Sequence, residues 1–272
     1  VTPNQYGTAW ATSVAWFGKN GSLDGSIAHI DPVSCGGPYH TKRAYGAIPL
    51  GDKVLFSANT FSAYGVQGHE VWEFSAASNV TDKLGTPCGV PTFVAARPVL
   101  LDDLVSGLAG LEPPLSGSIV SFDPARSEAP DYAALDHASS AGGCALGQDG
   151  ELLAVTCALG DKVYYHRATQ SGGAFFSEQV MTGTYEPLAI GTSKPALGAA
   201  PVVGVALRDA GQNLWFFVRD QTGAEVLEPA IIGGGDAIRS AFVMHDGIDF
   251  VVIWLAKVGG FEQAYGQRIT CE

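Results

Sequence analysis

The stretch LLAVTCALGDKVYYH, residues 152–166, carries the pattern on which the fold prediction rests. An apolar, β-rich run at residues 152–156 leads through Gly160 and Asp161 into a second run at residues 163–166. Short apolar runs separated by glycine and aspartate are typical of neighbouring strands in an antiparallel sheet. The stretch therefore predicts two consecutive antiparallel strands.

The same pattern recurs on both sides of this stretch. Residues 202–207 lead through residues 209–211 into Leu214, and residues 250–254 lead through Gly259 and Gly260 into Tyr265. Further upstream, residues 54–57 lead towards Val71. Each copy predicts part of an antiparallel meander.

Six short runs, which we call anchors, mark one position in each copy of a repeat. Their starts lie 45, 47, 45, 51 and 50 residues apart, and periods of about 40–50 residues are typical of four-stranded propeller blades. The spacing predicts an all-β fold, a six-bladed β-propeller that spans residues 1–272 as a single domain. The alternative is a pair of β-sandwich domains, although a sandwich gives no reason for so long a period. The anchors are residues 26–29, 71–74, 118–121, 163–166, 214–217 and 264–267. In the third repeat, residues 100–114 are rich in leucine and glycine and are expected to form a loop or a short helix.

The composition agrees with an all-β fold. Hydrophobic residues make up 46% of the 272 residues, which is enough for a sizeable core, whereas charged residues reach only 15%, below the roughly 25% of typical soluble domains. The chain also contains 35 glycines and 15 prolines. Such an abundance of turn-forming residues argues against a helical protein.

The charge excludes several classes of partner. The net charge is −12 and no basic stripe offsets it, so neither nucleic acid nor an anionic membrane is expected to bind. The longest apolar stretch, residues 248–257, includes Asp249 and is too short to span a bilayer, so no membrane insertion is predicted. The chain begins without a basic and then apolar leader, and we expect any signal peptide to have been removed.

The five cysteines favour an exported protein. They form no CxxC pair, which argues against a zinc ribbon or a thioredoxin-type site. Disulfides in an oxidising compartment suit the acidic, lysine-poor composition better. Cys35 and Cys88 lie in similar contexts, CGGP and CGVP, and are the preferred pair. Cys144 and Cys157 are the alternative second pair, although a hairpin that turns near residues 149–150 is expected to place them only diagonally opposite.

The last repeat resembles a repeat of bacterial secreted and cell-surface propeller-like proteins. The residues that carry the resemblance are DGIDFVVIW, residues 246–254, and AYGQRI, residues 264–269, which match the patterns DGxxFVVxW and YGQR. The resemblance covers about 25 residues and implies an exported β-propeller. It implies no catalytic set, because that family has no single activity.

No motif assigns a reaction. HExxH, GxSxG and the P-loop pattern are all absent, so no catalytic residue is assigned. Carboxylates gather at residues 102–103, residues 123–131, and Asp246 with Asp249, and turn aspartates in solvent are the default interpretation of each group. Asp123, Glu128 and Asp131 concentrate three carboxylates in an expected loop and are the best candidates for a calcium site.

The aromatic residues divide into two sets. Trp72 and Trp215 occupy equivalent anchor positions and are expected to pack between neighbouring blades. Trp10, Trp16 and Tyr39 lie nearer to expected loops, and a flat ring in such a place can stack on the C–H face of a sugar. These three residues are the candidate ligand-binding residues.

The function favoured by these patterns is a non-enzymatic binding module, secreted or on the cell surface, that recognises carbohydrate or protein. The alternative is a propeller hydrolase or lyase whose site, at the mouth of the central channel, is assembled from dispersed residues that one sequence does not reveal. A structural repeat domain of a larger surface protein is the third possibility. No cofactor other than calcium is expected.

Overall fold

The computed structural model describes residues 143–148, 152–169, 177–193 and 200–270 with their side chains, together with Ser22. Elsewhere it describes the backbone of the strands given below. The described residues contain no helix, and every described pairing between strands is antiparallel. The prediction of an all-β fold is therefore confirmed.

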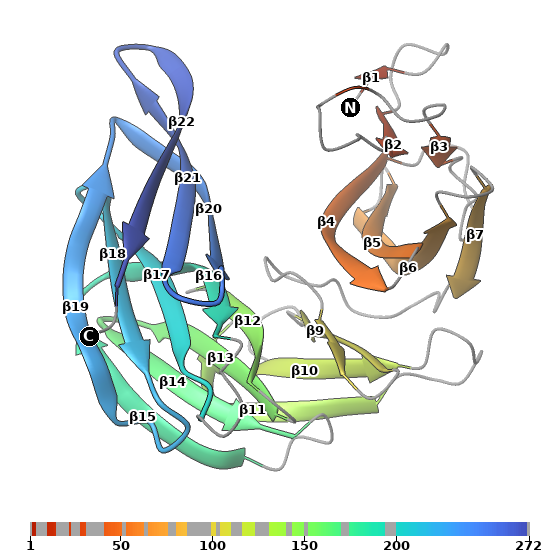
Figure 1. Ribbon diagram of the computed structural model, residues 1–272. Coiled ribbons are helices and arrows are strands. Elements are labelled where there is room, and N and C mark those ends of the chain that lie inside the picture. Colours follow the sequence, from red (N-terminus) through yellow and green to blue (C-terminus); the bar gives the residue numbers. More distant parts are fainter. Residues whose placement is uncertain are drawn as a thin grey trace. The chain divides into compact units, whose positions relative to one another are not determined.

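The strands form six sheets, and each sheet is built from consecutive strands (Figure 1). The first sheet contains β1 (Thr2–Pro3), β2 (Trp10–Val14) and β3 (Ala28–Ile30), and the second contains β4 (Thr41–Leu50), β5 (Lys53–Ser62), β6 (Gly65–Ser75) and β7 (Val80–Gly85). The third contains β8 (Val99–Leu101), β9 (Leu104–Ala109), β10 (Ser116–Phe122) and β11 (Asp131–Ser139), and the fourth contains β12 (Cys144–Asp149), β13 (Leu152–Leu159), β14 (Lys162–Ala168) and β15 (Ala174–Thr182). The fifth contains β16 (Tyr185–Thr192), β17 (Val203–Asp209), β18 (Asn213–Arg219) and β19 (Glu225–Gly234), and the sixth contains β20 (Ala237–His245), β21 (Phe250–Val258) and β22 (Phe261–Ile269).

The six anchors of the sequence repeat fall on one position in this architecture. They lie in or overlap β3, β6, β10, β14, β18 and β22, and each of these strands is the third of its sheet. The third repeat departs from expectation in one respect. Residues 100–114, expected to form a loop or a short helix, instead contribute to β8 and β9. A short leucine- and glycine-rich run is compatible with either structure, and pairing within the sheet decides between them.

The chain divides into two compact units. One comprises Val1–Phe93, Asp102–Val105 and Ser121–Asp131, and the other, which we call the second unit, comprises Val94–Leu101, Ser106–Val120 and Tyr132–Glu272. In the second unit the first strands of successive sheets contact one another: β8 contacts β12, β12 contacts β16, and β16 contacts β20. The first strands of successive sheets in this unit therefore lie next to one another.

Two hydrophobic cores join the last three sheets face to face. Between the fourth and fifth sheets, Tyr165 of β14 packs with Leu207 of β17 and Phe217 of β18, and all three are fully buried. Between the fifth and sixth sheets, Phe216 and Phe250 pack with ring centroids 5.6 Å apart. Side chains alternate between the two faces of a strand, so neighbours such as Phe216 and Phe217 serve different cores. Burying a side chain of this size contributes about 1.5–3 kcal/mol.

The approach of the fifth and sixth sheets requires a glycine. A Cβ atom on Gly204 would lie 2.6 Å from Phe216 Cζ and 2.9 Å from Phe250 Cδ1. Neither ring is at the end of a flexible chain, so a larger residue would force the aromatic pair apart. Close packing of the two sheets, rather than an unusual backbone conformation, therefore requires glycine at position 204.

A disulfide joins Cys144 of β12 to Cys157 of β13. The two residues are direct partners in the hairpin register, which pairs Asp149 with Leu152 and Cys144 with Cys157, and their Cα atoms are 4.2 Å apart. Directly opposed residues that do not exchange backbone hydrogen bonds are the closest pairs in an antiparallel ladder. The expectation that Cys144 and Cys157 lie diagonally opposite each other was wrong. The preferred pair, Cys35 with Cys88, lies outside the described residues.

Candidate functional site

The fifth sheet has two ends, and the polar side chains of the candidate site lie at one of them. Tyr185 at the start of β16 pairs with Asp209 at the end of β17, while Thr192 and Val203 pair at the opposite end. We call the first end the Glu186 end, after the charged residue that follows Tyr185. It combines the start of a first strand with the turn between β17 and β18.

An ion pair within the fifth sheet is linked to the sixth sheet at the Glu186 end through Arg208. Arg208 donates from Nη2 to Glu186 Oε2 and from Nη1 to the backbone carbonyl of Ile238, at the start of β20. The Glu186 side chain is 48% exposed and that of Arg208 is 25% exposed. One guanidinium therefore fixes a solvent-accessible carboxylate at the junction of β16, β17 and β20.

The adjacent turn is organised by Asp209. Its Oδ2 accepts hydrogen bonds from Trp215 Nε1 at 2.8 Å and from Asn213 Nδ2 at 2.9 Å, and its Oδ1 accepts the Asn213 amide at 2.9 Å. Burial opposes ionisation of this carboxyl group, but the hydrogen bonds from Trp215, Asn213 and Gly211 outweigh burial and hold the pKa of Asp209 below its usual value. Asp209 is thus a structural carboxylate that fixes the Trp215 ring.

The fixed tryptophan brings an aromatic surface to the same end. The rings of Tyr185 and Trp215 meet edge to face, with centroids 5.8 Å apart and an interplanar angle of 84°. Gln212 in the turn has a φ of 63° and accepts the Ile238 amide with its Oε1 at 2.9 Å. The Glu186 end therefore carries an accessible carboxylate paired with an arginine, and two oriented aromatic rings that pack against the core between the fourth and fifth sheets.

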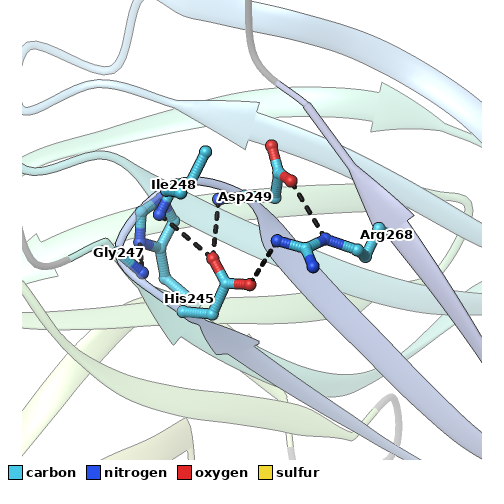
Figure 2. Close-up of polar contacts among 6 residues, drawn as sticks. His245, Gly247, Ile248, Asp249 and Arg268 are labelled. Carbon is cyan, nitrogen blue, oxygen red and sulfur yellow. Dashed lines mark hydrogen bonds and ion pairs between the residues drawn. The ribbon is translucent and has the colours of Figure 1, made fainter.

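A second polar group lies at the turn between β20 and β21 (Figure 2). Asp246 Oδ1 accepts the backbone amides of Ile248 and Asp249, and Arg268 of β22 donates to Asp246 Oδ2 at 2.5 Å and to Asp249 Oδ2 at 3.0 Å. The two backbone hydrogen bonds, with the Arg268 charge, hold the pKa of Asp246 below its usual value. The default interpretation of Asp246 as a turn aspartate is therefore supported, and Arg268 ties the turn to the last strand.

Most of the predicted site residues lie outside the described part. Trp16, Tyr39, Asp123 and Glu128 are outside the described residues altogether. Trp10 opens β2 and Asp131 opens β11, but their side chains are likewise outside it. Sugar stacking by Trp10, Trp16 and Tyr39, and calcium binding by Asp123, Glu128 and Asp131, stay predictions. The side chains that are described include no group of three or more potential metal ligands.

Glu186 and Arg208 were not singled out by the sequence. Neither belongs to a motif, and they are 22 residues apart. The one available signal was position along the chain, because Arg208 immediately precedes the turn aspartate Asp209 and Glu186 is the second residue of a first strand. Only the register of β16 with β17 brings the two side chains together.

No family model matches the chain, and no curated protein matches it in sequence. Solved structures do match it, at sequence identities too low to show more than the fold. A GH43 β-1,3-galactosidase matches with a TM-score of 0.51 and 8% identity over 95% of this chain and 60% of the galactosidase. The hydrazine synthase of Kuenenia stuttgartiensis matches with a TM-score of 0.55 and 14% identity over 84% of this chain and 63% of that one. TolB from Acinetobacter baumannii matches with a TM-score of 0.50 and 12% identity over 90% of this chain and 59% of TolB.

These comparisons bear on two of the predictions. The GH43 enzyme and TolB are β-propeller proteins, so the likeness supports a propeller-like arrangement of the sheets. The prediction of a non-enzymatic binding module was wrong: a glycoside hydrolase is among the similar structures, and it favours the alternative of a hydrolase. This chain spans about three fifths of the length of each of the three proteins.

No helix in the described residues is long and apolar enough to cross a membrane.

Proposed function

We propose that this chain is the propeller part of an exported glycoside hydrolase, with its six sheets as the six blades of one domain. The six anchors, each in the third strand of its sheet, support the blade count, and the contacts between first strands support a common inner edge. The likeness to the GH43 galactosidase supports a hydrolase on this fold. The disulfide between Cys144 and Cys157 supports an oxidising compartment, outside the cytosol.

The observation that carries the proposal is the Glu186 carboxylate. Hydrolysis of a glycosidic bond by the common mechanisms uses two carboxyl groups placed on either side of the bond. Glu186 is 48% exposed, is oriented by Arg208, and lies near the start of the first strand of its sheet. We assign Glu186 as one of the two carboxyl groups and expect the second on another blade.

The neighbouring aspartate does not fill the second role. Both oxygens of Asp209 already accept hydrogen bonds from its own turn and from Trp215. A carboxylate that holds a turn together in this way orients a neighbouring side chain and has little capacity left for substrate. Asp209 is therefore assigned as a positioning residue for Trp215.

The experiment measures release of 4-nitrophenol from a panel of aryl glycosides that includes α-L-arabinofuranoside, β-D-xyloside and β-D-galactoside. We expect one of them to be hydrolysed, and expect Glu186→Gln to lower kcat about 100-fold or more, as losing a general acid or base does. The matched control is Glu225→Gln, because Glu225 pairs with Arg219 at 3.0 Å at the opposite end of the same sheet. Glu225→Gln should retain full activity.

Two results would contradict the proposal. One is a folded protein that hydrolyses none of these glycosides and none of the corresponding polysaccharides. The other is an active protein in which Glu186→Gln and Glu225→Gln lower kcat equally, which would place catalysis elsewhere in the chain.

A further inference from the structure

Among the strands that the structure describes, β22, the last strand of the sixth sheet, has a neighbouring strand on one side only. The sheet contains three described strands, β20, β21 and β22, where the fourth and fifth sheets contain four. Seven of the nine residues of β22 are exposed, and only Tyr265 and Ile269 are partly buried. An uncovered edge strand presents a row of backbone N–H and C=O groups to which another strand can pair.

This edge differs from the last strands of the fourth and fifth sheets. β15 and β19 each pair with their neighbours through register shifts, and β19 also contains Pro229. Bulges and prolines are the usual means by which an edge is protected from pairing. In contrast, β22 pairs with β21 over nine consecutive residues without a shift, and it contains no proline or lysine.

The hairpin turn decides which amides face outward. Gly259 and Gly260 connect β21 and β22 with φ values of 59° and 90°, as in a two-residue turn with positive φ at both positions. The pair that closes such a turn, Val258 with Phe261, exchanges backbone hydrogen bonds, and this pattern alternates along the ladder. The backbone groups of Ala264 and Gly266 therefore point away from β21, towards the open edge.

The sequence of β22 is complementary to itself in the antiparallel sense. When two copies of FEQAYGQRI are aligned antiparallel about Tyr265, Glu262 lies opposite Arg268 of the second copy, and the reciprocal pair forms as well. Ala264 then lies opposite Gly266 of the second copy, where both have outward-facing backbone groups. A contact in which each copy presents the same surface closes on itself as a two-fold dimer.

We propose that β22 is a dimerisation edge, and that its occupant is β22 of a second copy of this chain. Opposite charges at directly paired positions stabilise an antiparallel pair. Within one chain Glu262 pairs only loosely with Arg239, at 3.4 Å with side chains 65% and 61% exposed. Exposed pairs of this kind contribute little, so Glu262 can bind Arg268 of the second copy while Arg268 keeps its contacts to Asp246 and Asp249.

The test is sedimentation velocity on the full chain, with the mass measured over about a hundredfold range of concentration. We expect a reversible monomer–dimer equilibrium. Ala264→Pro removes an outward amide and spares every hydrogen bond to β21, and Glu262→Arg places two like charges opposite each other. Each should raise the dissociation constant about tenfold or more, equivalent to about 1.4 kcal/mol.

Two controls keep the result interpretable. Glu228→Arg makes the same charge reversal on the β19 edge, which is interrupted by register shifts, and should leave the dissociation constant unchanged. Circular dichroism checks that Ala264→Pro is folded. A monomer throughout the range overturns the proposal, and so does a dimer that neither β22 variant weakens. Concentration-independent protection of the Ala264 and Gly266 amides from hydrogen exchange would identify a strand of the same chain as the occupant and would also overturn it.

Discussion

Replacing Trp215 by phenylalanine tests whether the Asp209 hydrogen bond fixes the turn at the Glu186 end. The substitution keeps an aromatic ring but removes the N–H that donates to Asp209 Oδ2 at 2.8 Å. Hydrogen bonds to charged groups contribute about 1.5–3 kcal/mol, and we expect a loss near the lower value because Asn213 still donates to the same oxygen. Trp215→Ala should cost more, about 3 kcal/mol, because the partly buried ring packs against the core between the fourth and fifth sheets.

Trp254 provides the matched control. Its side chain is buried, and its Nε1 is a buried nitrogen with no hydrogen-bond partner. Trp254→Phe therefore makes the same change from indole to phenyl ring without removing a hydrogen bond. The assay is urea unfolding of both variants and the parent, with the change in free energy of unfolding taken from the midpoint and slope.

The pH dependence separates the hydrogen bond from packing. The pKa of folded Asp209 lies below its unfolded value of about 3.9, so the stabilisation from its ionised form is complete above that value and is lost as pH falls through the folded pKa. The cost of Trp215→Phe should therefore shrink on acidification, whereas that of Trp254→Phe should not. Costs of the two variants that change in parallel with pH would refute the reasoning.

Two further changes test the packing of the second unit. Replacing both Cys144 and Cys157 by alanine should lower the free energy of unfolding by about 3 kcal/mol, the chain-entropy value for a loop of this length. In the parent, alkylation without reductant should leave both cysteines unmodified. Labelling of either cysteine would contradict the disulfide. Gly204→Ala should cost about 1–3 kcal/mol through overpacking, since its Cβ would lie 2.6 Å from Phe216 Cζ. Gly266→Ala meets no atom nearer than 3.7 Å and is the control in the same thermal unfolding experiment; equal shifts in the two midpoints would rule out the overpacking argument.

The repeat was readable from the sequence because it depends on local chemistry. Residues 152–166 alternate apolar runs with a glycine–aspartate turn, and that pattern constrains the backbone whatever surrounds it. The third-strand position of every anchor follows from the same regularity. Where the local signal was ambiguous, as in residues 100–114, the prediction of a loop or helix failed because pairing with the neighbouring strands of the sheet, rather than residue preference alone, determines a strand.

The sequence by itself therefore determined the all-β class and the repeat, since these depend on residues close together in the chain. It did not determine which side chains meet. The register of β12 with β13 places Cys144 directly opposite Cys157, and the register of β16 with β17 places Glu186 directly opposite Arg208, 22 residues along the chain. Such contacts depend on register and on the packing of one sheet against the next, where a shift of one residue would turn every side chain to the other face.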